Sequence, residues 1–136
     1  MLFRSIPRPL ATRELAHPGL SEMRVVDTMH ERKATMAALA DGFVALPGGL
    51  GTLEETLEIL TWAQLGIHAK PVALLDVLGY YDGLRRLLEH AQAEGFVRSE
   101  HADLLLFATT PIELLDRLLT WRPTARRRAW LQPTQT

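Results

Sequence analysis

The sequence predicts an α/β domain in which helices cover a parallel β-sheet. Apolar segments alternate with helical segments along the 136 residues, and this order is typical of a parallel sheet with helical crossover connections. The apolar segments also lack polar–apolar alternation, as expected of strands that are buried on both faces. A chain of this length is expected to form one domain, over residues 1–120, followed by an arginine-rich, mobile tail at 121–136.

The first predicted elements are a strand and a helix that follow an irregular segment. Residues 1–22 contain three prolines and a glycine, which interrupt regular structure. We expect a strand at residues 23–27 and, directly after it, a helix that continues through Leu39. Thr28 and Glu31 have the spacing of a capping box, which favours a helix start at this point.

A glycine-rich loop joins the next predicted strand to its helix. The strand covers residues 42–46, the loop covers residues 47–51, and the helix begins at Thr52 and ends near Gly66. Thr52 and Glu55 have the spacing of a second capping box. The apolar face of this helix is predicted to carry Leu53, Leu57 and Leu60.

The second half of the chain repeats the same order of elements. We predict a buried strand at residues 71–77, an amphipathic helix at 81–94, a last strand at 104–108 and a last helix at 111–119. The cap of the last helix is one of two neighbours, Thr109 and Thr110.

Composition excludes several classes of protein. The sequence has no cysteine, which excludes a disulfide scaffold, a thiolate zinc site and a cysteine nucleophile. Fifteen basic and sixteen acidic residues give a net charge of −1, so no overall charge favours nucleic acid or a membrane surface. The apolar runs are shorter than a membrane helix needs, and residues 1–7 lack a secretory h-region. We therefore expect a soluble, cytoplasmic protein without a nucleic-acid or membrane partner.

Two strand–helix junctions carry unusual residues at the edge of the sheet where ligands of such folds bind. The first is residues 29–33 (MHERK). Arg32 and Lys33 fall in the first turn of a helix, where the helix dipole disfavours positive charge. An anionic ligand nearby would reverse this penalty. The alternative is that both side chains simply point into solvent.

The second junction is residues 47–55 (PGGLGTLEE). Its three glycines allow a sharp turn and a close approach of a ligand to the backbone, and the loop ends at a helix N-terminus, which suits a phosphate. The loop matches neither a Walker motif nor a dinucleotide fingerprint. We therefore expect phosphate binding, without ATP hydrolysis or NAD binding.

The glutamates after this loop have two interpretations each. Glu55 is either a helix cap or a carboxylate that acts on water or on a sugar. Glu54 shares a helix face with Glu58, and both are expected to be exposed. The five histidines are scattered and do not have metal-site spacing, so a zinc site is not expected.

Together, the two junctions resemble the paired signatures of the Lonely Guy family, cytokinin riboside 5′-monophosphate phosphoribohydrolases that are often mislabelled as lysine decarboxylases. The resemblance runs from about Ile6 to the last helix and includes residues 9–14, 61–66, 68–71 and 79–82. It implies a Rossmann-like fold with helices on both faces of the sheet, a homodimer, and hydrolysis of the N-glycosidic bond of a nucleoside 5′-monophosphate. It implies no metal and no cofactor.

The resemblance also implies roles for particular residues. Arg32 and Glu55 match the catalytic pair of the family. A carboxylate can stabilise an oxocarbenium-like transition state while it orients water, and Arg32 can hold the phosphate or polarise the departing base. Positions matching the nucleotide-binding residues of the family are Glu14, Lys33, Gly49, Leu50, Gly51, Thr52, Leu53, Glu54 and Thr61.

One departure from the family pattern concerns the start of the chain. Members of the family normally begin with a further βαβ unit that carries an earlier glycine-rich loop, and we expect that this sequence lacks it. A non-catalytic nucleotide-binding module is therefore an alternative. A lysine decarboxylase is disfavoured because neither lysine, Lys33 or Lys70, is well placed to form a Schiff base. AMP and cytokinin nucleotides remain equally open as substrates.

Overall fold

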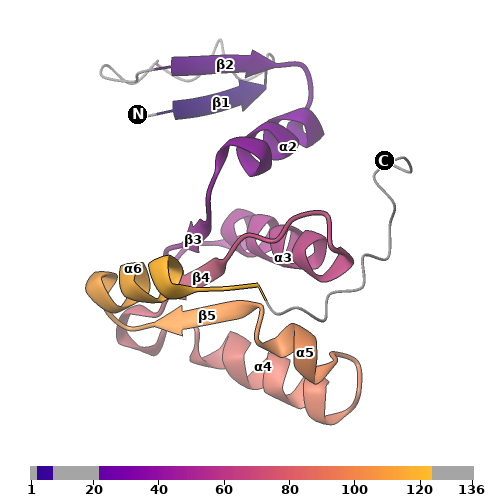
Figure 1. Ribbon diagram of the computed structural model, residues 1–136, viewed down its shortest axis with the longest axis vertical. Helices are drawn as coiled ribbons and strands as arrows, with labels where there is room; N and C mark the ends of the chain where they lie inside the picture. The colour runs from indigo at the N-terminus through magenta and orange to yellow at the C-terminus, as the bar shows by residue number, and fades with distance from the viewer. Residues whose placement is uncertain (1–2, 8–21, 124–136) are drawn as a thin grey trace. The chain divides into compact units, whose positions relative to one another are not determined.

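The computed structural model describes residues 3–7 and 22–123. The chain divides into two compact units, residues 1–40 and residues 41–136, and each unit is described by itself (Figure 1). Two sequence predictions concern residues outside the described ranges: the substrate-binding role of Glu14, and the mobile tail beyond residue 123. Residues 121–123 have no regular secondary structure.

The first unit contains two parallel strands and a helix. Strand β1 (Phe3–Pro7) pairs with β2 (Glu22–Val26) from Phe3 opposite Glu22 to Pro7 opposite Val26. The prediction that all of residues 1–22 are irregular is therefore wrong. Proline is tolerated at a strand end because the absent N–H removes no bond from the strand interior, so Pro7 ends β1 without preventing it.

Helix α2 (Met29–Leu39) completes this unit and begins as the sequence predicts. The Glu31 backbone N–H donates to the Thr28 hydroxyl at 3.0 Å. In return, the Glu31 carboxylate accepts from the Asp27 N–H at 3.0 Å. This reciprocal pair confirms the predicted cap, although the return bond comes from the residue before Thr28.

The second unit is a three-stranded parallel sheet flanked by helices (Figure 1). The strands lie in the order β3 (Phe43–Ala45), β4 (Val72–Leu75) and β5 (Leu105–Ala108), and both pairings are parallel. The connections and the C-terminal segment contain α3 (Leu50–Leu65), the 3₁₀ turn η1 (Val77–Gly79), α4 (Asp82–Ala93), the short α5 (Ser99–Ala102) and α6 (Pro111–Thr120).

Alternate residues of the strands contact helices on opposite faces of the sheet. Ala73 of β4 and Ala108 of β5 form a buried cluster with Leu114 of α6. The residue before Ala108, Phe107, points to the other face, where the Arg85 guanidinium of α4 lies 4.4 Å from the centre of its ring. Because successive side chains of a strand point to opposite faces, α6 and α4 cover different sides. This arrangement confirms the predicted sheet with helices on both faces.

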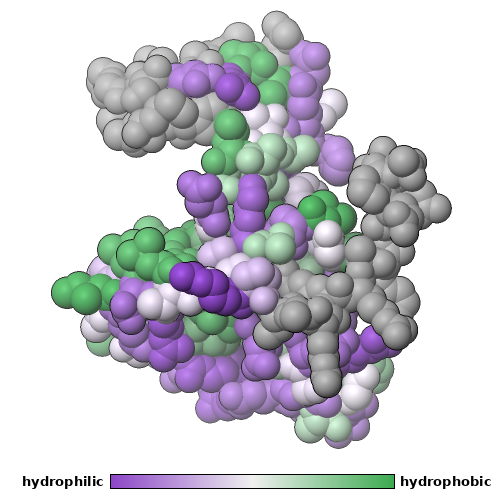
Figure 2. Space-filling model, in the orientation of Figure 1, coloured by the Kyte–Doolittle hydropathy of each residue, from purple (hydrophilic) through white to green (hydrophobic). Residues whose placement is uncertain are grey.

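The central strand β4 carries the apolar core. Val72, Ala73 and Leu74 are at most 1% exposed, as expected of a strand with helices on both faces. The edge strand β3 is more open, since Val44 remains 46% exposed. Helix α6 also keeps an apolar outer face, which Figure 2 shows as green atoms, and which is formed by Ile112, Leu115 and Leu119.

Helix α3 differs from its prediction at its start and in its buried face. It begins at Leu50 after the N-cap Gly49, and no side chain caps it, so the proposed capping box of Thr52 and Glu55 is wrong. The predicted apolar face is also wrong, because Leu57 is exposed and the buried residues are Thr56, Ile59 and Ala63. Burial of Thr56 is tolerated because its hydroxyl donates to the Thr52 carbonyl at 2.6 Å.

The remaining boundaries follow from local caps. Gly66 ends α3 with a left-handed φ of 79°, as predicted. Thr110 is the N-cap of α6, and its hydroxyl accepts from the Glu113 N–H at 3.2 Å. The strand predicted at residues 71–77 ends at Leu75, where the chain turns into η1. Across the described ranges, no helix combines the length and apolar character needed to cross a bilayer.

Candidate active site

The glycine loop lies at the carboxyl end of β3 and leads directly into the N-terminus of α3. Its backbone does not use left-handed conformations, because Gly48, Gly49 and Gly51 all lie outside the positive-φ region. A Cβ atom at Gly49 or Gly51 would meet no other atom within 4 Å. These two glycines therefore border open space, where a ligand can approach the first N–H groups of α3.

Gly48 has a different role from its two neighbours. A Cβ atom on Gly48 would lie 2.2 Å from Thr52 Oγ1 and 2.8 Å from Thr52 Cβ. Glycine at position 48 thus allows the loop to pack closely against the first turn of α3. The Leu53 N–H then donates to the Gly49 carbonyl at 3.1 Å, which is the first intrahelical bond after the loop.

The structure brings together the predicted residues of the loop and the first turns of α3. Gly49 to Glu55 form one continuous stretch, in which Glu54 is exposed and Glu55 is half-buried. Glu58 is half-buried, so the expectation that it is exposed is wrong. Thr61 lies six residues beyond Glu55, about 9 Å along the helix axis, and its hydroxyl donates to the Leu57 carbonyl at 2.7 Å.

The other half of the predicted site belongs to the first unit. Arg32 and Lys33 lie in the N-terminal part of α2, which confirms that two cations occupy this end of the helix. Both side chains are half-buried. The Arg32 N–H donates to the Thr28 carbonyl at 3.1 Å, so the backbone at this position is fixed by the start of the helix.

Residues after β4 contact the glycine loop, and sequence reasoning assigned them no role. The Tyr81 hydroxyl donates to the Leu46 carbonyl at 2.6 Å, and the Tyr80 hydroxyl donates to the Gly48 carbonyl. These bonds join residues 35 and 32 positions apart. The only sequence signal was that residues 79–82 match the family pattern.

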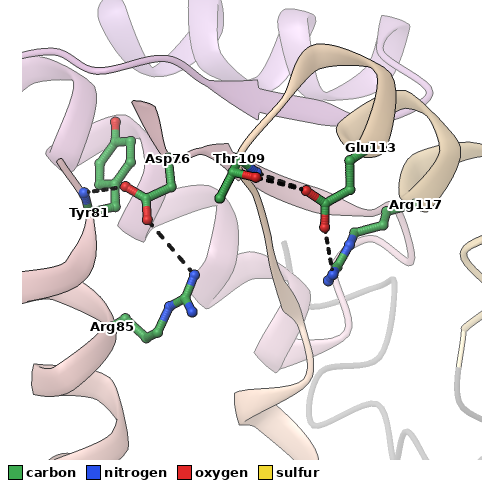
Figure 3. Close-up of polar contacts among 6 residues, drawn as sticks. All are labelled: Asp76, Tyr81, Arg85, Thr109, Glu113 and Arg117. Atoms are coloured by element: carbon green, nitrogen blue, oxygen red, sulfur yellow. Dashed lines mark hydrogen bonds and ion pairs between the residues drawn. The ribbon is translucent and has the colours of Figure 1, made fainter. Parts of the chain in front are cut away.

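A buried carboxylate, Asp76, binds the backbone of Tyr81 (Figure 3). Asp76 is 4% exposed and accepts from the Tyr81 N–H at 2.8 Å. Its second oxygen lies 3.9 Å from Nη2 of Arg85. Burial raises the pKa of Tyr81, and the neighbouring Tyr80 and Asp76 raise it further, so the hydroxyl keeps its proton to a higher pH than an exposed tyrosine does.

A groove of about 740 Å³ runs beside strand β5 and is bordered by α3, α4 and α6. Thr61 lies at its α3 side, and Glu113 and Arg117 of α6 lie at another side. The Glu113 carboxylate accepts from the Thr109 N–H at 2.9 Å and lies 2.8 Å from Arg117 Nη2 (Figure 3). The Thr109 N–H, and to a smaller extent Arg117, lower the pKa of Glu113.

The start of α3 has the kind of donor groups that an anion needs. Over residues 3–7 and 22–123, no three histidine or acidic side chains gather as a metal site would require. The loop instead offers backbone N–H groups at a helix N-terminus, with a carboxylate, Glu55, in the following turn. This combination can hold a phosphate and place a carboxylate near the group attached to it.

The parallel sheet with helices on both faces defines an α/β protein of the Rossmann-like class. A family model described as "Possible lysine decarboxylase" matches residues 4–118. The chain belongs to this family, and the resemblance to the Lonely Guy proteins is confirmed by its relatives.

Three relatives illustrate the similarity. The chain is 48% identical over 118 residues to "Probable cytokinin riboside 5'-monophosphate phosphoribohydrolase LOGL2" of Oryza sativa subsp. japonica, an alignment that covers 87% of this chain and 48% of the relative. It is 49% identical to "Cytokinin riboside 5'-monophosphate phosphoribohydrolase LOG4" of Arabidopsis thaliana. That alignment covers 87% of this chain and 55% of the relative. For LOG3 of Arabidopsis thaliana, the identity is 48%, over 90% of this chain and 57% of the relative. The chain thus spans about half the length of the curated relatives it matches.

Proposed function

We propose that the protein hydrolyses the N-glycosidic bond of a nucleoside 5′-monophosphate and releases a free base and ribose 5-phosphate. The observation that carries this proposal is the open backbone at Gly49 and Gly51, at the start of α3 and one turn before Glu55. The names of the relatives, which are phosphoribohydrolases of a cytokinin riboside 5′-monophosphate, support the same reaction. Both AMP and a cytokinin nucleotide fit the proposal.

The loop residues would bind the 5′-phosphate. Gly49 to Thr52 present the first N–H groups of α3, which suit an anion, whereas the Leu53 N–H is already bonded to the Gly49 carbonyl. Fixing the phosphate positions the ribose, which lowers the entropic part of the barrier to reaction at the sugar. Glu54, Thr61, Lys33 and Glu14 are proposed as further nucleotide-binding residues.

Glu55 and Arg32 would act on the reacting bond. Cleavage of an N-glycosidic bond develops positive charge on the ribose ring, and the Glu55 carboxylate can stabilise this charge while it orients a water molecule. The departing base gains negative charge, which the Arg32 guanidinium can offset. Arg32 can alternatively bind the phosphate, in which case its loss raises KM rather than lowering kcat.

Two further proposals concern the assembly and location of the protein. We propose that it forms a homodimer, because α6 keeps an apolar face of three large residues, 57–83% exposed, and such faces are typical of protein interfaces. We also propose that it acts in the cytoplasm. A mass in solution equal to one chain of 15.3 kDa would contradict the dimer.

The test is release of a free base. The purified protein is incubated with AMP and with N6-isopentenyl-AMP, and the free base is measured by chromatography. We expect that Glu55→Gln lowers kcat by about 100-fold or more, the usual range for loss of an acid–base group. Glu94→Gln, which neutralises an exposed carboxylate at the end of α4, is the matched control and should retain full activity.

Two outcomes would contradict the proposal. Equal activity of Glu55→Gln and the wild-type protein would remove Glu55 from the reaction. Tight binding of AMP without base release by a folded wild-type protein would favour the alternative, a non-catalytic nucleotide-binding module.

A further inference from the structure

Two adjacent tyrosines connect the turn after β4 to the glycine loop after β3. Tyr81 donates to the Leu46 carbonyl at 2.6 Å, and Tyr80 donates to the Gly48 carbonyl. The two acceptors flank Pro47, so the loop is held at two points directly before it enters α3. The tyrosine rings pack edge to face, with centroids 5.0 Å apart, which limits the motion of each hydroxyl.

The turn that carries these tyrosines is fixed from the core side. Asp76, at the end of β4, accepts from the Tyr81 N–H at 2.8 Å, and its own N–H donates to the Ala108 carbonyl of β5 at 2.7 Å. Between Asp76 and Tyr80, Leu78 adopts a left-handed φ of 52° with a fully exposed side chain. This conformation is unfavourable for a residue with a Cβ atom, and it persists only where the surroundings impose it.

The bond from Tyr80 acts on the peptide group that faces the proposed phosphate. The Gly48 carbonyl and the Gly49 N–H belong to one planar trans peptide and point in opposite directions. A donor on the carbonyl therefore fixes the direction of the N–H on the other side. It also polarises the peptide, which makes the N–H a stronger donor to an anion. Around Gly49 the space that a Cβ would occupy is open.

We propose that Tyr80 and Tyr81 are positioning residues that orient the Gly48–Gly49 peptide of the glycine loop toward the 5′-phosphate of the substrate. This inference rests on the proposed function and extends it. Tyr80 acts on the phosphate-facing peptide itself, whereas Tyr81, which is 2% exposed, fixes the start of the loop at Leu46. Neither tyrosine is proposed to contact the reacting atoms.

The test compares two variants that each remove one hydroxyl. Tyr80→Phe removes the donor to Gly48 at a residue that is 52% exposed, so the fold should be retained. Thr120→Val is the matched control, because it removes a hydroxyl that donates to a backbone carbonyl, that of Asp116 at 2.8 Å, at the end of α6. Tyr81→Phe is the second test variant and is expected to lower thermal stability as well.

Four measured quantities separate positioning from general loss of structure. For Tyr80→Phe, we expect KM for AMP and Kd for inorganic phosphate to rise about 3- to 10-fold, the loss of roughly one hydrogen bond, with kcat unchanged. Amide hydrogen exchange should become faster in a peptide covering residues 46–53 and stay unchanged in peptides of β5 and α6. Thr120→Val should match the wild-type protein in all four.

The outcomes distinguish this inference from the proposed function. If the wild-type protein binds AMP, but Tyr80→Phe shows the wild-type KM and the wild-type exchange over residues 46–53, the positioning role is refuted. A fall in kcat with unchanged KM would also refute it. If the wild-type protein binds neither AMP nor phosphate, the proposed function fails, and the phosphate role of the tyrosines fails with it.

Discussion

Replacing Gly48 by alanine tests whether the close approach of the glycine loop to α3 is required for folding. The added Cβ atom would lie 2.2 Å from Oγ1, 2.8 Å from Cβ and 3.2 Å from Cγ2 of Thr52. Rotation of the Thr52 side chain relieves only part of this collision, because its Cβ atom is fixed to the backbone of α3. The loop or the first turn of the helix must therefore move.

The expected size of the effect follows from this geometry. Overpacking of a close contact costs about 1–3 kcal/mol, and 1 kcal/mol shifts the unfolding midpoint of a chain of about 100–150 residues by roughly 3–5 °C. We expect Gly48→Ala to lower the midpoint by about 3–15 °C. Gly51→Ala is the matched control, because a Cβ atom at Gly51 meets nothing within 4 Å and alanine favours helix by up to about 1 kcal/mol.

Thermal unfolding followed by far-ultraviolet circular dichroism measures both variants under the same conditions. Gly51→Ala should melt at or slightly above the wild-type temperature, and Gly48→Ala clearly below it. If the two variants melt within about 2 °C of each other, a difference smaller than 1 kcal/mol, the loop does not depend on contact with Thr52. The distinction between Gly48, which packs against α3, and Gly49 and Gly51, which border open space, would then be wrong.

Two further predictions concern the core and the buried phenol. Leu114 is 4% exposed and packs on Ala73 and Ala108, so Leu114→Ala should lower the free energy of unfolding by about 2–5 kcal/mol, measured by urea denaturation; a loss under 1 kcal/mol would contradict the burial of this side chain. The pKa of Tyr81 is raised above 10.0, mainly by burial. The folded state therefore keeps a proton that the unfolded chain loses, and the associated stability, complete below pH 10, is lost as the pH rises through the raised pKa. Melting temperatures at alkaline pH should fall less steeply for Tyr81→Phe than for the wild-type protein, and identical slopes would contradict this assignment.

Local sequence patterns predicted much of the fold because the features concerned are local. Thr28, Gly66 and Thr110 mark helix ends through contacts within a few residues, and the structure confirms all three. The apolar runs predicted parallel strands because burial on both faces removes alternation. The cations Arg32 and Lys33 lie in the N-terminal part of α2, as the sequence predicts.

The errors arise where tertiary contacts override a local pattern. Thr52 and Glu55 have capping-box spacing, but the helix begins earlier, at Leu50, directly after the extended N-cap residue Gly49. Thr56 is buried in preference to Leu57, since its hydroxyl is satisfied within the helix. The roles of Tyr80 and Tyr81 depend on carbonyls more than 30 residues away, and no local pattern records such a contact.

The order of the strands in the second unit has a consequence for how the chain folds during synthesis. Strands β3, β4 and β5 are neighbours in space in the same order as in the chain, so each strand can pair as soon as the next one leaves the ribosome. The α6 face of the sheet is different. Its buried cluster joins Ala73 and Ala108 to Leu114, so one apolar face of the nascent sheet stays uncovered until α6, the final described helix, has been translated. During that interval, the exposed apolar surface makes the growing chain prone to aggregation.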